Sequence, residues 1–261
     1  MRFLQLLRVF YRTSIQADME YRIDFFTRII ASLLGLLTTA GSLSIAYGFT
    51  STLKGWTFPQ AVVLLAIYYL MDGLIEMFNA PNMRAVMTQV REGTLDFVLL
   101  KPVSSQFLAS FRTINIWRMA NVLVGLGLTF YAVGRLSLSV GPREAAAFDL
   151  TLGAGLVVIY SFWLFLVTLT FWFVRIENIE QIVWQAFEAG RYPIEIYPAW
   201  LRGGLTYVVP VAFIISVPAG ALTGRTGDAT TLTALAVAAT MLVASSAFWR
   251  VGLKHYTGAS A

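Results

Sequence analysis

Long apolar stretches separated by shorter polar ones dominate this chain. Six of them approach the roughly 20 apolar residues that cross a membrane as a helix. They cover about 25–48, 58–79, 113–134, 148–174, 204–223 and 230–250. The alternation that suits a membrane barrel is absent, and open strands cannot satisfy their backbone in lipid. The pattern predicts an all-α integral membrane protein with six transmembrane helices.

The N-terminal segment 2–22 has a different pattern, in which apolar and polar residues take opposite sides of a helix. The apolar side holds Phe3, Leu6, Leu7, Phe10 and Ile15, and the polar side holds Gln5, Arg8, Arg12 and Gln16. This pattern indicates a basic amphipathic helix in the inner headgroup layer. A cytoplasmic extension of the first span is the alternative. Charged residues interrupt any apolar core, so the segment is not a signal peptide.

Two segments between the expected spans are long and polar, residues 80–112 and 175–203. The other connections, near 49–57, 135–147 and 224–229, are short and leave no room for an extracellular binding domain. We therefore treat residues 1–261 as one membrane domain. The polar residues that are most informative about its function lie mostly in these two segments and in the N-terminal helix.

Composition and charge agree with the membrane class. Hydrophobic residues make up 57% of the chain and charged residues 13%, which excludes an ordinary soluble enzyme and a disordered chain. If the N-terminus is cytoplasmic and six spans alternate, 15 of the 19 Lys and Arg residues lie on the inside. The positive-inside rule therefore predicts cytoplasmic N- and C-termini. The net charge of +5 is then a topology signal and a contact with lipid, and nucleic-acid binding is not expected.

Residues for catalysis are scarce. The chain has no cysteine and a single histidine, His255, which leaves little for metal or triad chemistry. The Gly-Lys dipeptide of a phosphate-binding loop is absent, as are the HExxH and GxSxG motifs. We therefore expect no catalytic, metal or cofactor site, and no ATP hydrolysis by this chain alone.

Four charged residues lie within or beside the expected spans. Asp72 and Glu76 share one helix face, because they are four residues apart. They have either a structural role, such as pairing with Arg112 or Arg118, or a role in transport or proton relay. The two arginines are otherwise expected to anchor the third span by reaching the headgroups. In that span, Gly125 and Gly127 would permit close helix approach.

The segment 90–103, VREGTLDFVLLKPV, predicts a short cytoplasmic helix. Gly93 ends one helical turn, Thr94 caps the next, and Asp96 lies near the positive end of that helix. Pro102 stops the helix near Lys101. An apolar stripe at helical spacing consists of Leu95, Val98 and Leu99. Such a helix is suited to docking into a groove on a soluble partner.

Residues 91–102, REGTLDFVLLKP, resemble the first cytoplasmic coupling loop of type-2 ATP-binding-cassette (ABC) permeases. Residues 191–198, RYPIEIYP, followed by a Pro-containing fifth span, are similar to an exporter-permease subgroup of that family, as is the ending 249–260. The similarity covers the whole chain: amphipathic start, six spans and both loops in order.

The resemblance implies a permease half in a bacterial-type inner (plasma) membrane. Its partners would be separate ABC ATPase subunits, which bind ATP and Mg, and a second permease, either identical or related. Family members mostly export lipids, glycans, drugs or other amphipathic molecules. The coupling loop would lie within 84–105, and its implied ATPase-coupling residues are Arg91, Glu92, Gly93, Thr94, Leu95, Asp96, Lys101 and Pro102. The N-terminal helix would be the family's interfacial elbow helix.

The second polar segment is open to two interpretations. It is a proline-rigidified cytoplasmic turn, or a second cytoplasmic contact with the ATPase made by Arg191, Tyr192, Pro193, Glu195 and Pro198. Its prolines bias 192–198 away from helix, whereas 178–189 is expected to be helical. Between the fifth and sixth spans only 224–229 remains, so family members with a large extracellular helical insertion there are poor templates.

Two other classes compete with the exporter interpretation. A membrane-embedded lipid-modifying enzyme would use Asp72 and Glu76 and would be active without nucleotide. A stand-alone secondary transporter would need no ATPase and should show inverted repeats, which the sequence does not display.

Overall fold

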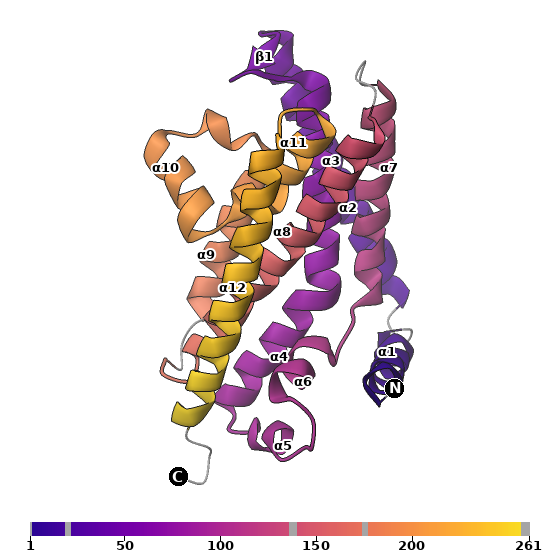
Figure 1. The fold of residues 1–261 in the computed structure, drawn as a ribbon. Coiled ribbons are helices and arrows are strands. Elements are labelled where there is room, and N and C mark those ends of the chain that lie inside the picture. The colour runs from indigo at the N-terminus through magenta and orange to yellow at the C-terminus, as the bar shows by residue number, and fades with distance from the viewer. Residues whose placement is uncertain (1, 19–21, 136–139, 174–176, 257–261) are drawn as a thin grey trace.

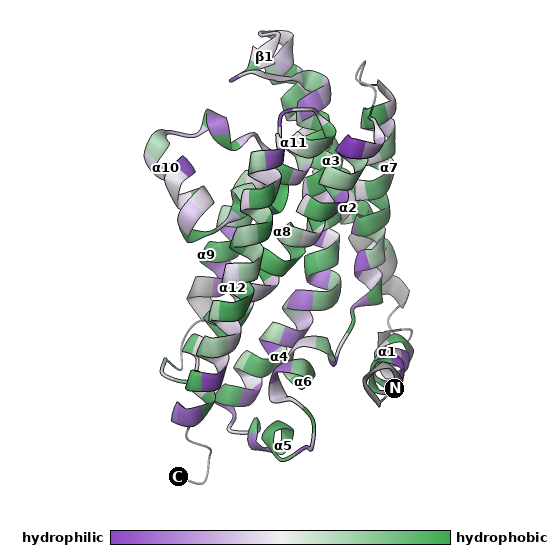
Figure 2. Ribbon diagram, viewed as in Figure 1, coloured by the Kyte–Doolittle hydropathy of each residue, from purple (hydrophilic) through white to green (hydrophobic). Residues whose placement is uncertain are grey.

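The computed structural model describes residues 2–18, 22–135, 140–173 and 177–256. These residues form an elongated bundle of helices with one short hairpin at one end, as Figure 1 shows. Five of the described helices are long and apolar enough to cross a membrane, and a bent pair is a sixth candidate. Apolar residues line the middle of the long helices in Figure 2. The all-α membrane fold is confirmed, and the count of six spans stays a prediction.

The centre of the bundle is one long helical segment. It begins as α3 (Phe58–Leu74), passes through the π-helical turn η1 (Ile75–Asn79) and ends as α4 (Ala80–Arg91). In its most apolar stretch 78% of the residues are buried, against 11% for α2 (Arg22–Gly48). α3 is therefore core, whereas α2 leaves most of its surface open to lipid or to another subunit.

Close packing of α3 against α7 (Met119–Arg135) depends on two glycines. A Cβ on Gly125 would lie 2.4 Å from the backbone nitrogen of Leu70, and one on Gly73 would lie 2.6 Å from that of Val122. Since backbone cannot yield as a side chain can, both positions require glycine. The expected close approach at Gly125 is confirmed, but Gly127 faces open space.

A proline fixes the start of the third span. Pro81, in α4, has no N–H to donate to the carbonyl of Met77, four residues earlier. That carbonyl instead accepts from the backbone N–H of Asn115 at 2.9 Å. The Asn82 amide donates to the carbonyl of Thr113 at 2.7 Å, and its oxygen accepts from the Thr113 N–H at 2.8 Å. Residues 113–115 are therefore held in non-helical form, and the third span begins only at η2 (Ile116–Arg118) rather than at 113.

The helices α8 (Pro142–Leu169) and α12 (Asp228–His255) run parallel. Arg143 forms an ion pair with Asp228 where both helices begin. Near their other ends, a Cβ on Gly252 would lie 2.6 Å from a Thr168 methyl carbon. Parallel packing agrees with two even-numbered spans that cross the membrane in the same direction. α8 begins six residues before the expected start at 148 and ends before 174.

The expected fifth span, 204–223, is not one helix. The segment Ala199–Val208 and the segment Ala212–Leu222 meet at an angle of 78°. Pro210 causes the break, because a proline pushes the residue before it out of helical conformation; Val209 is extended, with φ −108° and ψ 105°. The bent pair comprises α10 (Ala199–Gly203), η5 (Gly204–Val208), η6 (Ala212–Ser216) and α11 (Val217–Leu222).

The position of the second polar segment, residues 175–203, differs from the predicted topology. This segment contains α9 (Glu177–Glu188), which confirms the expected helix, followed by the 3-10 turns η3 (Ala189–Arg191) and η4 (Ile194–Ile196). Glu195 accepts from the indole N–H of Trp56 at 3.0 Å. Trp56 belongs to the hairpin of β1 (Thr52–Leu53) and β2 (Trp56–Thr57).

The hairpin lies at the opposite end of the bundle from α5 (Asp96–Leu99) in Figure 1. Residues 191–198 and the outside connection 49–57 were predicted on opposite sides of the membrane, yet they are in contact. The structure therefore contradicts a cytoplasmic surface shared by 191–198 and 91–102. Between the expected fifth and sixth spans, α11 (Val217–Leu222) and α12 (Asp228–His255) are joined by only a short connection, as expected.

The N-terminal segment forms α1 (Arg2–Asp18), beside the lower end of α7 in Figure 1. The segment is helical, as expected, and its role as an amphipathic helix stays a prediction. Its position in the headgroup layer remains a prediction.

Candidate functional site

The turn between α4 and α5 is fixed by its own sequence. Gly93 has φ +69°, the left-handed conformation that glycine adopts without strain. The N–H groups of Thr94 and Leu95 then donate to the carbonyl of Gln89, at 2.9 and 3.3 Å, and close the end of α4. Leu95 occupies the N-cap position of α5, without a side-chain cap. The prediction that Thr94 caps this helix was therefore wrong.

The two sides of α5 have different surroundings. Leu95 and Val98 are buried, and Leu99 packs against the same core cluster. Phe97 and Leu100 are exposed, with 71% and 81% of their surface accessible. The predicted apolar stripe therefore faces the protein's own core, and a different pair of apolar residues faces outward.

The other implied coupling residues lie around α5 at the same end of the bundle. Their exposure differs: Arg91, Glu92, Lys101 and Pro102 are exposed, whereas Gly93, Thr94 and Asp96 are half-buried. Leu95, which is fully buried, can position this surface but cannot touch a partner.

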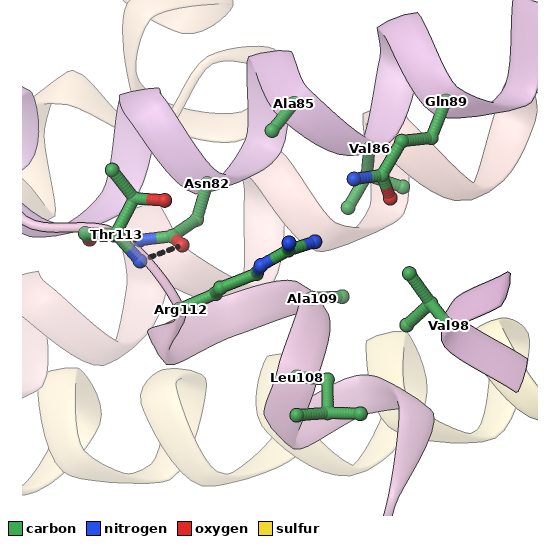
Figure 3. A pocket seen from close by; sticks show the side chains of 9 residues that line it. All are labelled: Asn82, Ala85, Val86, Gln89, Val98, Leu108, Ala109, Arg112 and Thr113. Carbon is green, nitrogen blue, oxygen red and sulfur yellow. Dashed lines mark hydrogen bonds between the residues drawn. The ribbon is translucent and has the colours of Figure 1, made fainter. Parts of the chain in front are cut away.

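A cavity of about 270 Å³ lies behind α5, between α4 and α6 (Ser105–Phe111). Figure 3 shows the Arg112 side chain pointing into it, and Val98 of α5 at its edge. Arg112 therefore does not form the pair with Asp72 or Glu76 that was one expectation. The cavity separates part of α5 from α4.

The C-terminal end of α12 reaches the same region. Tyr256 lies near Asp96, and burial together with the nearby carboxylate raises the pKa of its hydroxyl. Its ring packs against Phe171, with ring centres 5.6 Å apart. Contacts from α5 therefore lead to two long helices, α4 and α12.

Glu76 is held by two arginines. Its carboxylate lies 3.0 Å from Arg84 and 3.3 Å from Arg118, and Arg84 also pairs with Glu180 at 2.6 Å. Pairing with Arg118 was one of the expectations. Arg84 and Glu180 were missed, because Glu180 belongs to α9, about a hundred residues after its partner.

Asp72 has a different environment, although it is one turn from Glu76. Its Oδ2 accepts from the side-chain amide of Asn121 at 2.7 Å, and the oxygen of that amide accepts from Ser32. Among the described residues Asp72 takes part in no ion pair. It faces a cleft.

This cleft has a volume of about 320 Å³ and is lined by α2, α3, α7, α9 and the adjoining turns. Two acidic and two basic residues line it: Asp72, Glu188, Arg118 and Arg191. Arg191 lies over the ring of Tyr68 at 5.0 Å and pairs with Glu188 at 3.2 Å. The Nε–H groups of Arg118 and Arg191 are buried, and neither has a hydrogen-bond partner among the described residues. The cleft can accept a polar or zwitterionic group.

The remaining residues of the second expected contact lie away from α5. The hydroxyls of Tyr192 and Ser42 are 3.1 Å apart, and Glu195 contacts Trp56. Pro193 is buried and Pro198 is exposed. Within the described ranges, no cluster of three or more His, Cys, Asp or Glu residues could hold a metal ion.

A family model described as "ABC-2 family transporter protein" matches residues 31–260. The chain belongs to this family. No curated protein and no solved structure matches it significantly. It is therefore a permease subunit of an ABC transporter and a multi-pass membrane protein, and the family implies ABC ATPase subunits as partners. The matched region of this permease includes both the α5 turn and the cleft.

Proposed function

We propose that this permease is half of an ATP-driven exporter and that α5 docks on a separate ATPase subunit. One observation carries the proposal: Phe97 and Leu100 are exposed at one end of the bundle, on a short helix whose other side is buried in the permease. Large apolar side chains of this kind anchor a helix in a groove. The ATPase would bind ATP and Mg, since this chain has no phosphate-binding loop.

The packing around α5 supports transmission of force. Leu95 and Val98 fix α5 to the core, and α4 is continuous with α3 through η1. Tyr256, which directly follows α12, lies near Asp96 of α5, and its hydroxyl has no hydrogen-bond partner among the described residues. A push from the ATPase would therefore tilt α3 and α12 as near-rigid bodies.

The cleft is the proposed part of the substrate pathway in this subunit. It lies between α3 and the largely open helix α2, where a second permease, identical or related, would complete the pathway. Its four charged residues suit the polar group of an amphipathic substrate. The α5 end and both termini would be cytoplasmic in a bacterial-type inner membrane, with α1 in contact with lipid.

The geometry does not favour a lipid-modifying enzyme. Such an enzyme would need Asp72 and Glu76 as an acid–base pair. The two carboxylate oxygens of Glu76 are engaged by the guanidinium groups of Arg84 and Arg118, so neither oxygen is free for a substrate. We therefore propose that this subunit is not catalytic.

A double substitution tests the coupling role. Phe97→Ser with Leu100→Ser should lower recovery of a co-expressed ATPase at least about tenfold, because two exposed apolar anchors are lost. The matched control is Leu123→Ser with Phe130→Ser on α7, where the exposed fractions are 61% and 76%. The proposal would be contradicted if the Phe97/Leu100 variant still formed the complex with the ATPase and showed unchanged ATP hydrolysis. An equal loss of ATPase recovery in the control variant would contradict it as well.

A further inference from the structure

A third cavity lies at the end of α3, next to the π-helical turn η1. It has a volume of about 420 Å³ and is bounded by α3, η1, α6, α8 and α12. This volume lies within the range of small-molecule sites, roughly 300–1,000 Å³. The cavity shares no lining residue with the cleft or with the cavity behind α5.

One polar side chain in this cavity lacks partners. Asn79 is 8% exposed, and both its Nδ2 and its Oδ1 are buried with no hydrogen-bond partner among the described residues. A buried polar atom without a partner is destabilising, because it has lost its hydrogen bonds to water and gained none in return. Asn79 ends the π-helical turn η1, and such turns are frequent at functional sites.

The other polar groups of the cavity satisfy one another. The Ser110 hydroxyl donates to the carbonyl of Gln106 at 2.6 Å and lies 2.8 Å from the Tyr160 hydroxyl. The Gln106 amide donates to Tyr160 at 3.2 Å. No charged residue lines the cavity. Asn79 is therefore the group that a ligand would satisfy, and that ligand need not be charged.

The cavity opens toward the surface of the bundle. Three of its lining residues are exposed, namely Phe78, Phe111 and Leu242. They are all apolar and border the opening between η1, α6 and α12. A molecule dissolved in the membrane could enter between them with its chain in the apolar part and its polar group at Asn79.

We propose that this cavity binds an uncharged lipid that has one apolar chain and a hydroxyl group. A hydroxyl can donate to Asn79 Oδ1 or accept from its Nδ2, whereas an alkane can do neither. A carboxylate offers no donor and would bring a charge to a cavity without a cation. The proposal is independent of the exporter role, because it requires neither the ATPase nor the cleft.

Photolabelling of the full-length permease in lipid nanodiscs tests the site. The probes are a diazirine-bearing dodecanol, the diazirine alkane of equal length and the corresponding fatty acid. The dodecanol probe should label residues 74–79, 110–111 and 156–160, and excess unlabelled dodecanol should compete. Asn79→Leu should lower this labelling about tenfold while labelling by the alkane changes less than twofold.

Two further variants keep the test decisive if Asn79→Leu folds poorly. Leu242→Trp, at the opening, should reduce labelling by all probes, whereas Leu123→Trp, on the exposed side of α7, should not. Labelling that spreads evenly over the exposed helices and is the same in all variants would show partition into the membrane and overturn the proposal. Equal labelling by the fatty acid would overturn the uncharged class.

Discussion

The two long polar segments of this permease, 80–112 and 175–203, look alike in composition but have different positions in the fold. The first closes one end of the bundle with α4, α5 and α6. The second lines the cleft with Arg191 and reaches the hairpin at the other end with Glu195. Polar composition between two apolar stretches therefore does not by itself place a segment at the membrane surface.

The difference comes from where each segment finds its partners. The first uses local devices: Gly93 turns the chain, and the Ser104 hydroxyl accepts from the Phe107 N–H at the start of α6. In the second, Arg191 contacts Tyr68 and Glu195 contacts Trp56, both more than a hundred residues earlier. Local partners can be inferred from sequence, whereas distant ones cannot.

Chemical accessibility should distinguish the positions of the two segments most clearly. The chain has no cysteine, so Phe97→Cys, Ile196→Cys and Thr52→Cys each introduce one thiol at an exposed position. An impermeant maleimide added to sealed vesicles should label positions 52 and 196 from the same side and position 97 from the other. The measurement is the mass shift with and without detergent. Labelling of positions 97 and 196 from the same side would instead support the predicted cytoplasmic surface shared by the two segments.

The two sides of α5 should differ sharply in their effect on stability. Leu95→Ala removes a fully buried side chain and should lower the free energy of unfolding by about 2–5 kcal/mol. Phe97→Ala, at an exposed position, should change it by less than about 0.5 kcal/mol. Unfolding in detergent measures both values. Similar losses in the two variants would show that α5 does not have one buried and one open side.

Interior packing of the second segment gives a smaller effect. A Cβ on Gly190 would lie 2.8 Å from a Val211 methyl carbon and 2.3 Å from the end of Ile215. Gly190→Ala should therefore lower the unfolding free energy by about 1–3 kcal/mol through overpacking. The control Gly203→Ala meets no atom within 4 Å and should be neutral or stabilise α10 by up to about 1 kcal/mol. An unchanged unfolding free energy in Gly190→Ala would show that residues 189–191 do not pack against the core.

Alkaline pH should produce the smallest effect, at the junction of α5 and α12. Burial and Asp96 raise the pKa of Tyr256, so the folded state holds this proton more tightly than the unfolded state. The resulting stabilisation is fully present below the ordinary tyrosine pKa of about 10 and is lost as pH rises through the higher folded value. Melting temperatures at about pH 8 and 11 should therefore fall less for Tyr256→Phe than for the natural chain. Equal decreases in melting temperature for the two proteins would show that Asp96 and Tyr256 are not in contact.

Parts of the candidate site could be predicted, and parts could not. The left-handed turn at Gly93 followed from the residues themselves, whereas the different surroundings of Asp72 and Glu76, which are one turn apart, did not. Pro210 was visible in the sequence and could have indicated the broken fifth span. The exposed side of α5 could not be predicted, because Leu95, Val98, Phe97 and Leu100 are all apolar and only the packing of α5 on the core separates them.

The membrane class, the long helices and the turn between α4 and α5 can be inferred from the sequence alone, because they depend on the length of apolar stretches and on the conformation of one glycine. The packing of the helices, by contrast, pairs Glu76 with arginines, turns Asp72 toward a cleft and brings Glu195 to the hairpin. It also decided that Asn79 lacks a partner in a cavity. Each of these contacts depends on which helices, distant in the sequence, pack side by side. The periodicity of a single sequence does not show which helices do so.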